Sequence, residues 1–129
     1  MQAFLRIALV LAGLANIAWG LFAFSAPDRA AAVLEFGLTS VEGRGEIRAT
    51  YGGLILGLGL ALLVALRRPD ARGSLNLLAI VFGALSLGRL GSLVLDGFST
   101  YTASVAALEI LFTGFLALAA RYWEPPVKR

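Results

Sequence analysis

The chain is organised around a charged stretch at the start of its second long apolar run, Glu46-Ile47-Arg48-Ala49-Thr50-Tyr51-Gly52-Gly53. The stretch holds two opposite charges and a phenol, and the apolar run then continues to Leu66. Together they are long enough to cross a bilayer, which takes about 20 largely apolar residues. Because charge in that setting is costly, we expect these side chains to have partners in other segments of the chain.

The composition places the chain among membrane proteins. Of its 129 residues, 59% are hydrophobic and the mean hydropathy is +0.84, whereas soluble domains are about half apolar. The length predicts a single domain over residues 1–129. The net charge of +3 arises from Arg residues at the ends of apolar runs, which indicates topology and anionic headgroups rather than nucleic acid.

Four apolar runs predict an all-α bundle of four transmembrane helices. The expected spans are residues 4–24, 46–66, 73–95 and 101–122. The first run is longer than the apolar part of a signal peptide, so we expect an uncleaved helix. After it, Pro27 and Asp28 suit the start of a short interfacial helix that Gly37 closes. Residues 39–45 are expected to loop back to the second span.

Glycines follow two sides of the second span. At 100° per residue, one side holds Gly52 and Gly59 together with Arg48, and Gly53 and Gly57 lie almost opposite. Small residues four positions apart let helices approach closely in lipid, so the Gly53–Gly57 pair predicts a neighbour on that side as well. The alternative is that glycine is simply common in membrane helices.

A polar side chain interrupts each of the four spans. Asn16, Tyr51, Arg89 and Glu109 lie roughly 8 to 12 Å from the outer ends of their spans, at a rise of about 1.5 Å per residue. This common depth predicts one buried cluster in the outer half of the membrane. A charge near the centre of a span costs roughly 2.5 to 3.5 kcal/mol on insertion scales, so the charged members must face inward and pair.

The expected ion pair joins Arg89 to Glu109, because a planar guanidinium can bind a carboxylate through two parallel hydrogen bonds. Arg48 is expected as a second cation, with Asn16 and Tyr51 as hydrogen-bonding neighbours. Two acidic residues are expected nearer the membrane surface. The candidate ligand-binding or structural cluster is Asn16, Glu46, Arg48, Tyr51, Arg89, Asp96 and Glu109. The alternative is that the ion pair only fixes the helix register.

Catalytic chemistry is the class that the sequence supports least. The chain has no Cys and no His, which removes the usual ligand sets for zinc, copper, haem and iron–sulfur clusters. It also lacks a Gly-x-x-x-x-Gly-Lys run, and no strand precedes its glycine-rich second span. We therefore expect no enzyme activity, no metal site and no cofactor.

The positive charges predict the orientation in the membrane. Three Arg lie within residues 67–72 and three cationic residues lie in the tail 121–129, which are on the same side of a four-span chain. Because positive charge favours the cytoplasmic side, we expect both termini there. Arg29 and Arg44 lie in the first connection, on the opposite side of the membrane, and so oppose this prediction.

The order of these residues resembles that of a bacterial family of small four-helix integral membrane proteins, a domain of unknown function. The likeness covers nearly the whole chain. It rests on Pro27, the acidic-x-Arg-x-x-Tyr-Gly-Gly stretch from Glu46, Gly88-Arg89, Asp96-Gly97 and Glu109. It implies a bacterial inner-membrane protein with these polar positions as its signature, and it supplies no reaction. A looser likeness, in size and helix count alone, is to DoxX-like proteins, some of them associated with quinone-linked redox complexes.

Three functions remain open at this point. The polar cluster fits a binding protein for a small amphipathic or anionic ligand, such as a lipid headgroup or a quinone. The alternatives are a structural or accessory subunit of a larger membrane complex and a small proton-coupled carrier, which would require a homodimer. The expected partners are therefore the lipid bilayer, such a ligand, and a second copy or a larger complex.

Overall fold

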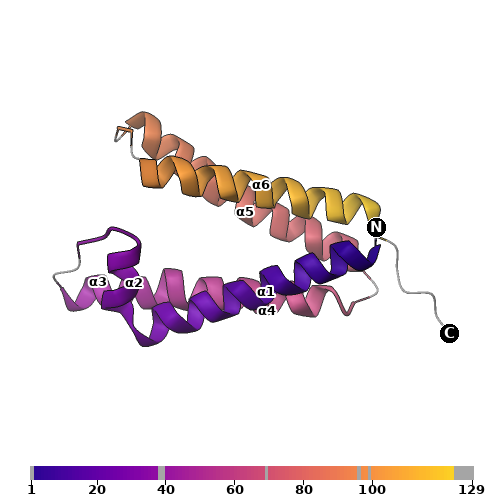
Figure 1. Ribbon diagram of the computed structural model, residues 1–129, viewed down its shortest axis with the longest axis horizontal. Coiled ribbons are helices and arrows are strands. Elements are labelled where there is room, and N and C mark those ends of the chain that lie inside the picture. The colour runs from indigo at the N-terminus through magenta and orange to yellow at the C-terminus, as the bar shows by residue number, and fades with distance from the viewer. Residues whose placement is uncertain (1, 38–39, 69, 96, 99, 124–129) are drawn as a thin grey trace. The chain divides into compact units, whose positions relative to one another are not determined.

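The computed structural model describes residues 2–37, 40–68, 70–95, 97–98 and 100–123, and it shows helices and no strands in that part of the chain. In order, the helices are α1 (Gln2–Ser25), α2 (Pro27–Val33), α3 (Val41–Glu46), η1 (Ile47–Leu54), α4 (Ile55–Ala65), α5 (Ala71–Leu95) and α6 (Thr100–Tyr122), as Figure 1 shows. The segment η1 is a π-helix.

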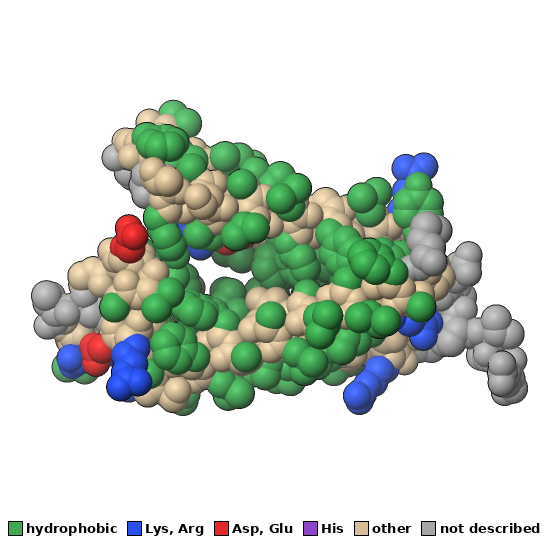
Figure 2. Space-filling model, in the orientation of Figure 1, with side chains coloured by type: hydrophobic (Ala, Val, Ile, Leu, Met, Phe, Trp, Pro, Cys, Tyr) green, Lys and Arg blue, Asp and Glu red, His purple; other side chains and the backbone are tan. Residues whose placement is uncertain are grey.

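Four helices are long and apolar enough to cross a membrane: Gln2–Ser25, Val41–Ala65, Ala71–Leu95 and Thr100–Tyr122. Many of their large apolar side chains are exposed, and hydrophobic side chains cover much of the surface in Figure 2. Such a surface fits lipid, where apolar side chains face the acyl chains. The all-α class with four spans is confirmed, and the chain is a multi-pass membrane protein.

The chain divides into two compact units, one formed by α1 to α4 and the other by α5 and α6. The single domain expected over residues 1–129 stays a prediction.

In the first unit, α1 packs closely against η1 and α4 through glycines. A Cβ at Gly20 would lie 2.6 Å from the backbone nitrogen of Leu56, and one at Gly59 would lie 2.7 Å from the carbonyl oxygen of Gly13. Helices that approach this closely leave no room for a side chain at the contact. The glycine stripe that contains Gly52 and Gly59 therefore forms the helix contact.

Within the first unit, no other helix contacts the opposite glycine stripe. No atom lies within 4 Å of a Cβ built at Gly57, and one built at Gly53 meets only the Arg48 carbonyl oxygen of its own helix. The neighbouring helix expected at Gly53 and Gly57 therefore does not come from this unit, and it stays a prediction.

The second span begins five residues earlier than the sequence predicts, at Val41 rather than at Glu46. Ser40 has an extended backbone, and its hydroxyl accepts a hydrogen bond from the Gly43 nitrogen at 3.0 Å, which caps the helix. The loop expected over residues 39–45 is therefore wrong from Val41 onward, and Thr39 lies outside the described residues.

The short helix α2 is present and starts at Pro27, as expected, but it ends at Val33 instead of reaching Gly37. Glu35 takes a left-handed conformation with φ 57°, and the Phe36 nitrogen donates to the Ala31 oxygen at 2.8 Å. This is the Schellman arrangement that satisfies the last carbonyls of a helix, here without a glycine.

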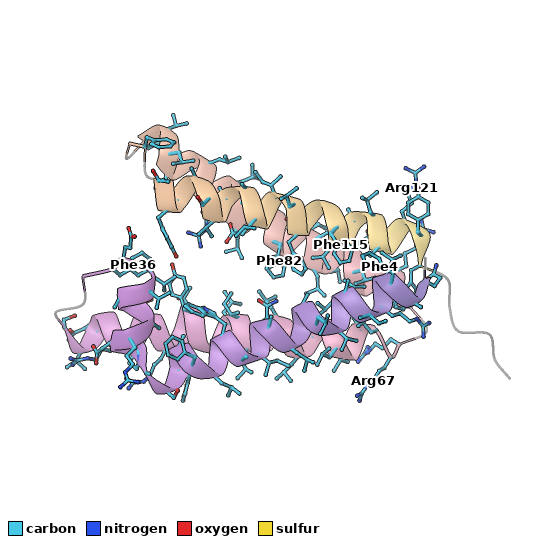
Figure 3. All side chains as sticks on the ribbon, in the orientation of Figure 1. Phe4, Phe36, Arg67, Phe82, Phe115 and Arg121 are labelled. Carbon is cyan, nitrogen blue, oxygen red and sulfur yellow. The ribbon has the colours of Figure 1, made fainter. Side chains whose placement is uncertain are left out.

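In the second unit, α5 and α6 form an antiparallel hairpin (Figure 1). Phe82 of α5 packs edge-to-face on Phe112 of α6, with ring centroids 4.8 Å apart, and Phe115 stacks beside Phe112 at 6.4 Å. Phe82 and Phe115 lie along the same side of the hairpin in Figure 3. The start of α5 precedes the expected residue 73 because Asp70 caps it by accepting a hydrogen bond from Gly73.

Candidate functional site

The predicted ion pair between Arg89 and Glu109 is present and joins α5 to α6. The Arg89 Nε donates to the Glu109 Oε1 at 2.9 Å, and the two side chains are 23% and 16% exposed. Each residue lies inside an apolar helix, where an unpaired charge is costly. Within the second unit, the charge on each of these two helices is therefore neutralised by the charge on the other.

Two polar atoms beside this pair are buried without a hydrogen-bond partner among the described residues. They are the second carboxylate oxygen of Glu109, Oε2, and the hydroxyl oxygen of Thr113, Oγ1. Thr113 follows Glu109 by four positions, so the two side chains lie on the same face of α6, one turn apart. A buried polar group left unsatisfied costs about 1 to 3 kcal/mol, so both atoms favour any donor that reaches them.

An apolar groove of about 470 Å³ runs along the α5–α6 contact. Its lining residues are Ile80, Gly83, Ala84, Ser86, Leu87, Leu90, Ile110 and Thr113. The groove exists because Gly83 and Ala84 are small, so that α5 leaves space beside Ile110 and Thr113. At Gly83, a Cβ would lie 3.5 Å from the Thr113 Cγ2, which is an ordinary contact distance.

The groove and the ion pair lie on opposite sides of the line where α5 meets α6. At 100° per residue, Leu87 and Leu90 turn to one side of Ser86, while Arg89 and Phe82 turn to the other. The buried hydroxyl of Ser86 donates to the Phe82 carbonyl at 2.9 Å and is thus already satisfied. Thr113 is therefore the one groove-lining residue that shares a helix face with the ion pair and has an unsatisfied polar atom in the described residues.

In the first unit, the charged stretch lies at the end of α1. Arg48 is exposed, and its Nε donates to the carbonyl oxygen of Phe24 at 3.1 Å. A Cβ at Gly52 would lie 3.0 Å from the Phe24 Cβ, so Gly52 approaches the same residue. Carbonyls in the last turn of a helix lack partners within the helix, and Arg48 satisfies one of them. This contact gives Arg48 a structural role in closing α1 against η1.

The stretch is itself helical but not α-helical, because Ile47–Leu54 forms the π-helix η1. Tyr51 lies within η1, and its ring packs edge-to-face on Phe36 with centroids 5.6 Å apart. The π-helix is a rare conformation that occurs mostly as short segments near functional sites. Through Tyr51, the π-helix η1 contacts Phe36, which follows the C-terminal end of α2.

Asn16 and Tyr51 are not neighbours, which corrects the expectation of a common depth for these two residues. The facing residues of the two antiparallel helices are Gly13 with Leu63, Gly59 with Ile17, Gly20 with Leu56, and Gly52 with Phe24. Tyr51 is therefore level with the end of α1, while Asn16 lies roughly 12 Å deeper, at the usual helical rise of about 1.5 Å per residue. Asn16 instead donates from Nδ2 to the Ala12 oxygen of its own helix at 3.0 Å.

The depth prediction was wrong because it measured Tyr51 from a helix start at Glu46, whereas the helix begins at Val41. The first turns of this helix extend beyond the end of α1. Glu46 is exposed at the end of α3. Asp96 lies outside the described residues. The grouping of all seven candidate residues into one cluster stays a prediction.

Two features of these units were not predicted from the sequence. Asp28 and Arg44 form an ion pair at 2.8 Å between α2 and α3, with side chains that are 61% and 44% exposed. Their separation of 16 residues gave no signal for this pairing. The other missed feature is the groove and its residue Thr113, for which the adjacent small residues Gly83 and Ala84 were the available signal.

The residues of the described ranges contain no group of three or more His, Cys, Asp or Glu side chains that could hold a metal ion. The second unit holds an apolar groove and a partly buried ion pair.

Comparison with curated proteins and with solved structures finds no match. A family model, Domain of unknown function (DUF4345), matches residues 4–120 and thus includes all four spans. This agrees with the expected resemblance to a family of unknown function, while the likeness to DoxX-like proteins stays unconfirmed. On the extent of this match, the chain belongs to the DUF4345 family.

Proposed function

We propose that this protein binds a small amphipathic molecule within the membrane, with its apolar chain in the α5–α6 groove. The volume of about 470 Å³ lies within the usual range of small-molecule sites, roughly 300 to 1,000 Å³. Such sites combine an apolar lining with a few polar groups that fix the orientation of the ligand. The α5–α6 groove supplies the apolar lining.

The observation that supports this proposal most strongly is the α5–α6 groove itself. Side chains of both helices line it, its lining is apolar, and its volume is about 470 Å³. Small-molecule sites in proteins are recesses of this size and character. We therefore favour ligand binding over a purely architectural role.

We also propose in which membrane the protein resides and on which side its termini lie. The Arg residues between α4 and α5 and in the tail favour the cytoplasmic side, which would place both termini there, in a bacterial inner membrane. The ligand would then reach the groove from the surrounding lipid, and no enzymatic step is required.

A substitution that fills the groove tests the proposal. Ala84 lines the groove and is exposed, so Ala84→Phe would place a phenyl ring where the chain binds. The matched control is Ala107→Phe, because Ala107 is an exposed alanine of α6 that does not line the groove. The probes are hexadecanol and its methyl ether, and bound probe is counted by native mass spectrometry of protein in mild detergent.

We expect Ala84→Phe to weaken binding of both probes about tenfold or more, which corresponds to a clash of about 1.4 kcal/mol. The Ala107→Phe variant should bind like the unmodified protein. Equal binding by the two variants would contradict the proposed site, as would a failure of the unmodified protein to bind either probe.

A further inference from the structure

We infer that the end of the second unit where α5 starts and α6 ends binds the headgroups of anionic phospholipids. Exposed arginines of this unit gather there, and we call them the basic end: Arg67, Arg68, Arg72 and Arg121. None of them lines the α5–α6 groove, so this inference is independent of the proposed function.

The antiparallel course of the hairpin brings the four arginines together. Arg72 lies in the first turn of α5, and Arg121 lies in the last turn of α6. Arg67 and Arg68 lie in the turn that leads into α5, and Figure 3 shows Arg67 and Arg121 at the same end of the hairpin. Residues from three segments of the chain thus present their positive charges at one level.

The aromatic residue Tyr122 indicates that this level is that of the lipid headgroups. Tyr122 is 47% exposed and ends the last span, where tyrosine favours the membrane–water interface. The Cζ atom of Arg121 lies 5.8 Å from the centre of the Tyr122 ring, within the range of a cation–π contact. Arg121 therefore lies where lipid phosphates lie.

The arginines of the basic end form no ion pair with any of the described residues. The acidic residue next to them is Asp70, and its Oδ1 accepts a hydrogen bond from the Gly73 nitrogen at 3.1 Å. This bond caps α5, so the carboxylate of Asp70 faces the start of the helix. Four positive charges therefore stand against one negative charge in this part of the described chain.

Charge complementarity selects an anionic headgroup. Arginines close to an anionic membrane surface are attracted to it, and a guanidinium binds phosphate oxygens through two parallel hydrogen bonds. A zwitterionic headgroup also carries a positive group, which the arginines repel. At the opposite end of the hairpin, the described residues from Leu90 to Val105 include no cation and expose Val94, Leu95 and Phe98. We therefore expect the anionic lipid at the basic end.

The experiment offers the full-length protein in mild detergent equal amounts of phosphatidylglycerol and phosphatidylcholine with the same acyl chains. Bound lipid is counted by native mass spectrometry, and we expect phosphatidylglycerol to be preferred. Arg68→Gln should lower this preference about fivefold, which corresponds to about 1 kcal/mol. The matched control is Arg44→Gln, because Arg44 is also exposed but already pairs with Asp28 at 2.8 Å. This control should leave the preference nearly unchanged.

A change of salt tests the same inference without any variant. Raising the salt from about 0.05 M to about 0.5 M should lower the preference of the unmodified protein, because salt screens exposed charges. Inorganic phosphate in millimolar excess should not displace the lipid at constant ionic strength.

Equal binding of the two lipids by the unmodified protein would overturn the inference and leave the arginines with a role in topology alone. A preference that salt does not change, or that Arg68→Gln and Arg44→Gln lower equally, would overturn it as well. Displacement by inorganic phosphate would show that the basic end recognises free phosphate instead of a lipid. In each case the groove, which Ala84→Phe tests, would be unaffected.

Discussion

The pairing of Arg89 with Glu109 explains how two charged residues are accommodated in apolar helices. The Nε–Oε1 distance of 2.9 Å and the low exposure of both side chains make this a partly buried pair. The ion pair between Asp28 and Arg44 has a similar distance, 2.8 Å, but both of its side chains are largely exposed. The two pairs therefore differ in burial rather than in geometry.

This difference predicts unequal effects on stability. We expect Glu109→Gln to lower the free energy of unfolding by about 2 to 3 kcal/mol, because it leaves Arg89 without its carboxylate. Asp28→Asn, the matched change in the exposed pair, should cost about 0.5 kcal/mol or less. Denaturant unfolding in mild detergent measures both, and equal effects would show that burial does not strengthen the Arg89–Glu109 pair.

Exchanging the two residues tests whether their pairing is what stabilises the hairpin. The double variant Arg89→Glu with Glu109→Arg keeps the ion pair but moves the carboxylate to α5. It should recover most of the stability lost in Glu109→Gln, as denaturant unfolding measures. A double variant no more stable than Glu109→Gln would contradict the pairing as the source of that stability.

Sequence alone was enough to identify this pair, because Arg89 and Glu109 are the charged residues inside their respective apolar runs. Thr113 could not be recognised in the same way. A threonine in a membrane helix usually satisfies its hydroxyl with a carbonyl one turn earlier. Only the folded structure shows that its Oγ1 is buried without a partner among the described residues and that the residue lines a groove.

At the level of helices, the contact of α1 with η1 and α4 depends on which glycines face the partner helix. A Cβ at Gly20 would lie 2.6 Å from the Leu56 nitrogen and 2.8 Å from the Gly52 oxygen, both of them backbone atoms. Backbone atoms cannot move aside as the end of a side chain can. Gly57, by contrast, has no atom within 4 Å of such a Cβ in the described structure.

We therefore predict opposite effects of the same substitution at two glycines. Gly20→Ala should lower the free energy of unfolding by about 1 to 3 kcal/mol, because the added methyl group forces the helices apart. Gly57→Ala should be neutral or raise it by up to about 1 kcal/mol, since alanine favours the helix. Denaturant unfolding of the two variants checks this, and a loss of stability at Gly57 comparable to that at Gly20 would be inconsistent with the observed contact.

The existence of the four spans was predictable, but their register was not. Apolar run length identifies a span, whereas the level of each residue depends on where its helix starts and on which residues of the partner it faces. Gly43 and Gly45 resemble loop residues and hide the helix start that the Ser40 cap sets at Val41. The resulting error of five residues shifted Tyr51 relative to Asn16.

For the molecule as a whole, the feature that supports ligand binding lies in the second unit. The lining residues of the groove all belong to α5 and α6. In the first unit, Arg48 and Gly52 of the charged stretch contact Phe24 at the end of α1, which accounts for them by packing and helix capping. The stretch that organises the fold is thus not the stretch that we propose to bind the ligand.

An experimental structure of the protein extracted together with its native lipids tests this account most directly. We expect elongated density along the α5–α6 groove beside Ala84 and Leu87. An empty groove, or an Arg89 guanidinium that points into lipid away from Glu109, would contradict it.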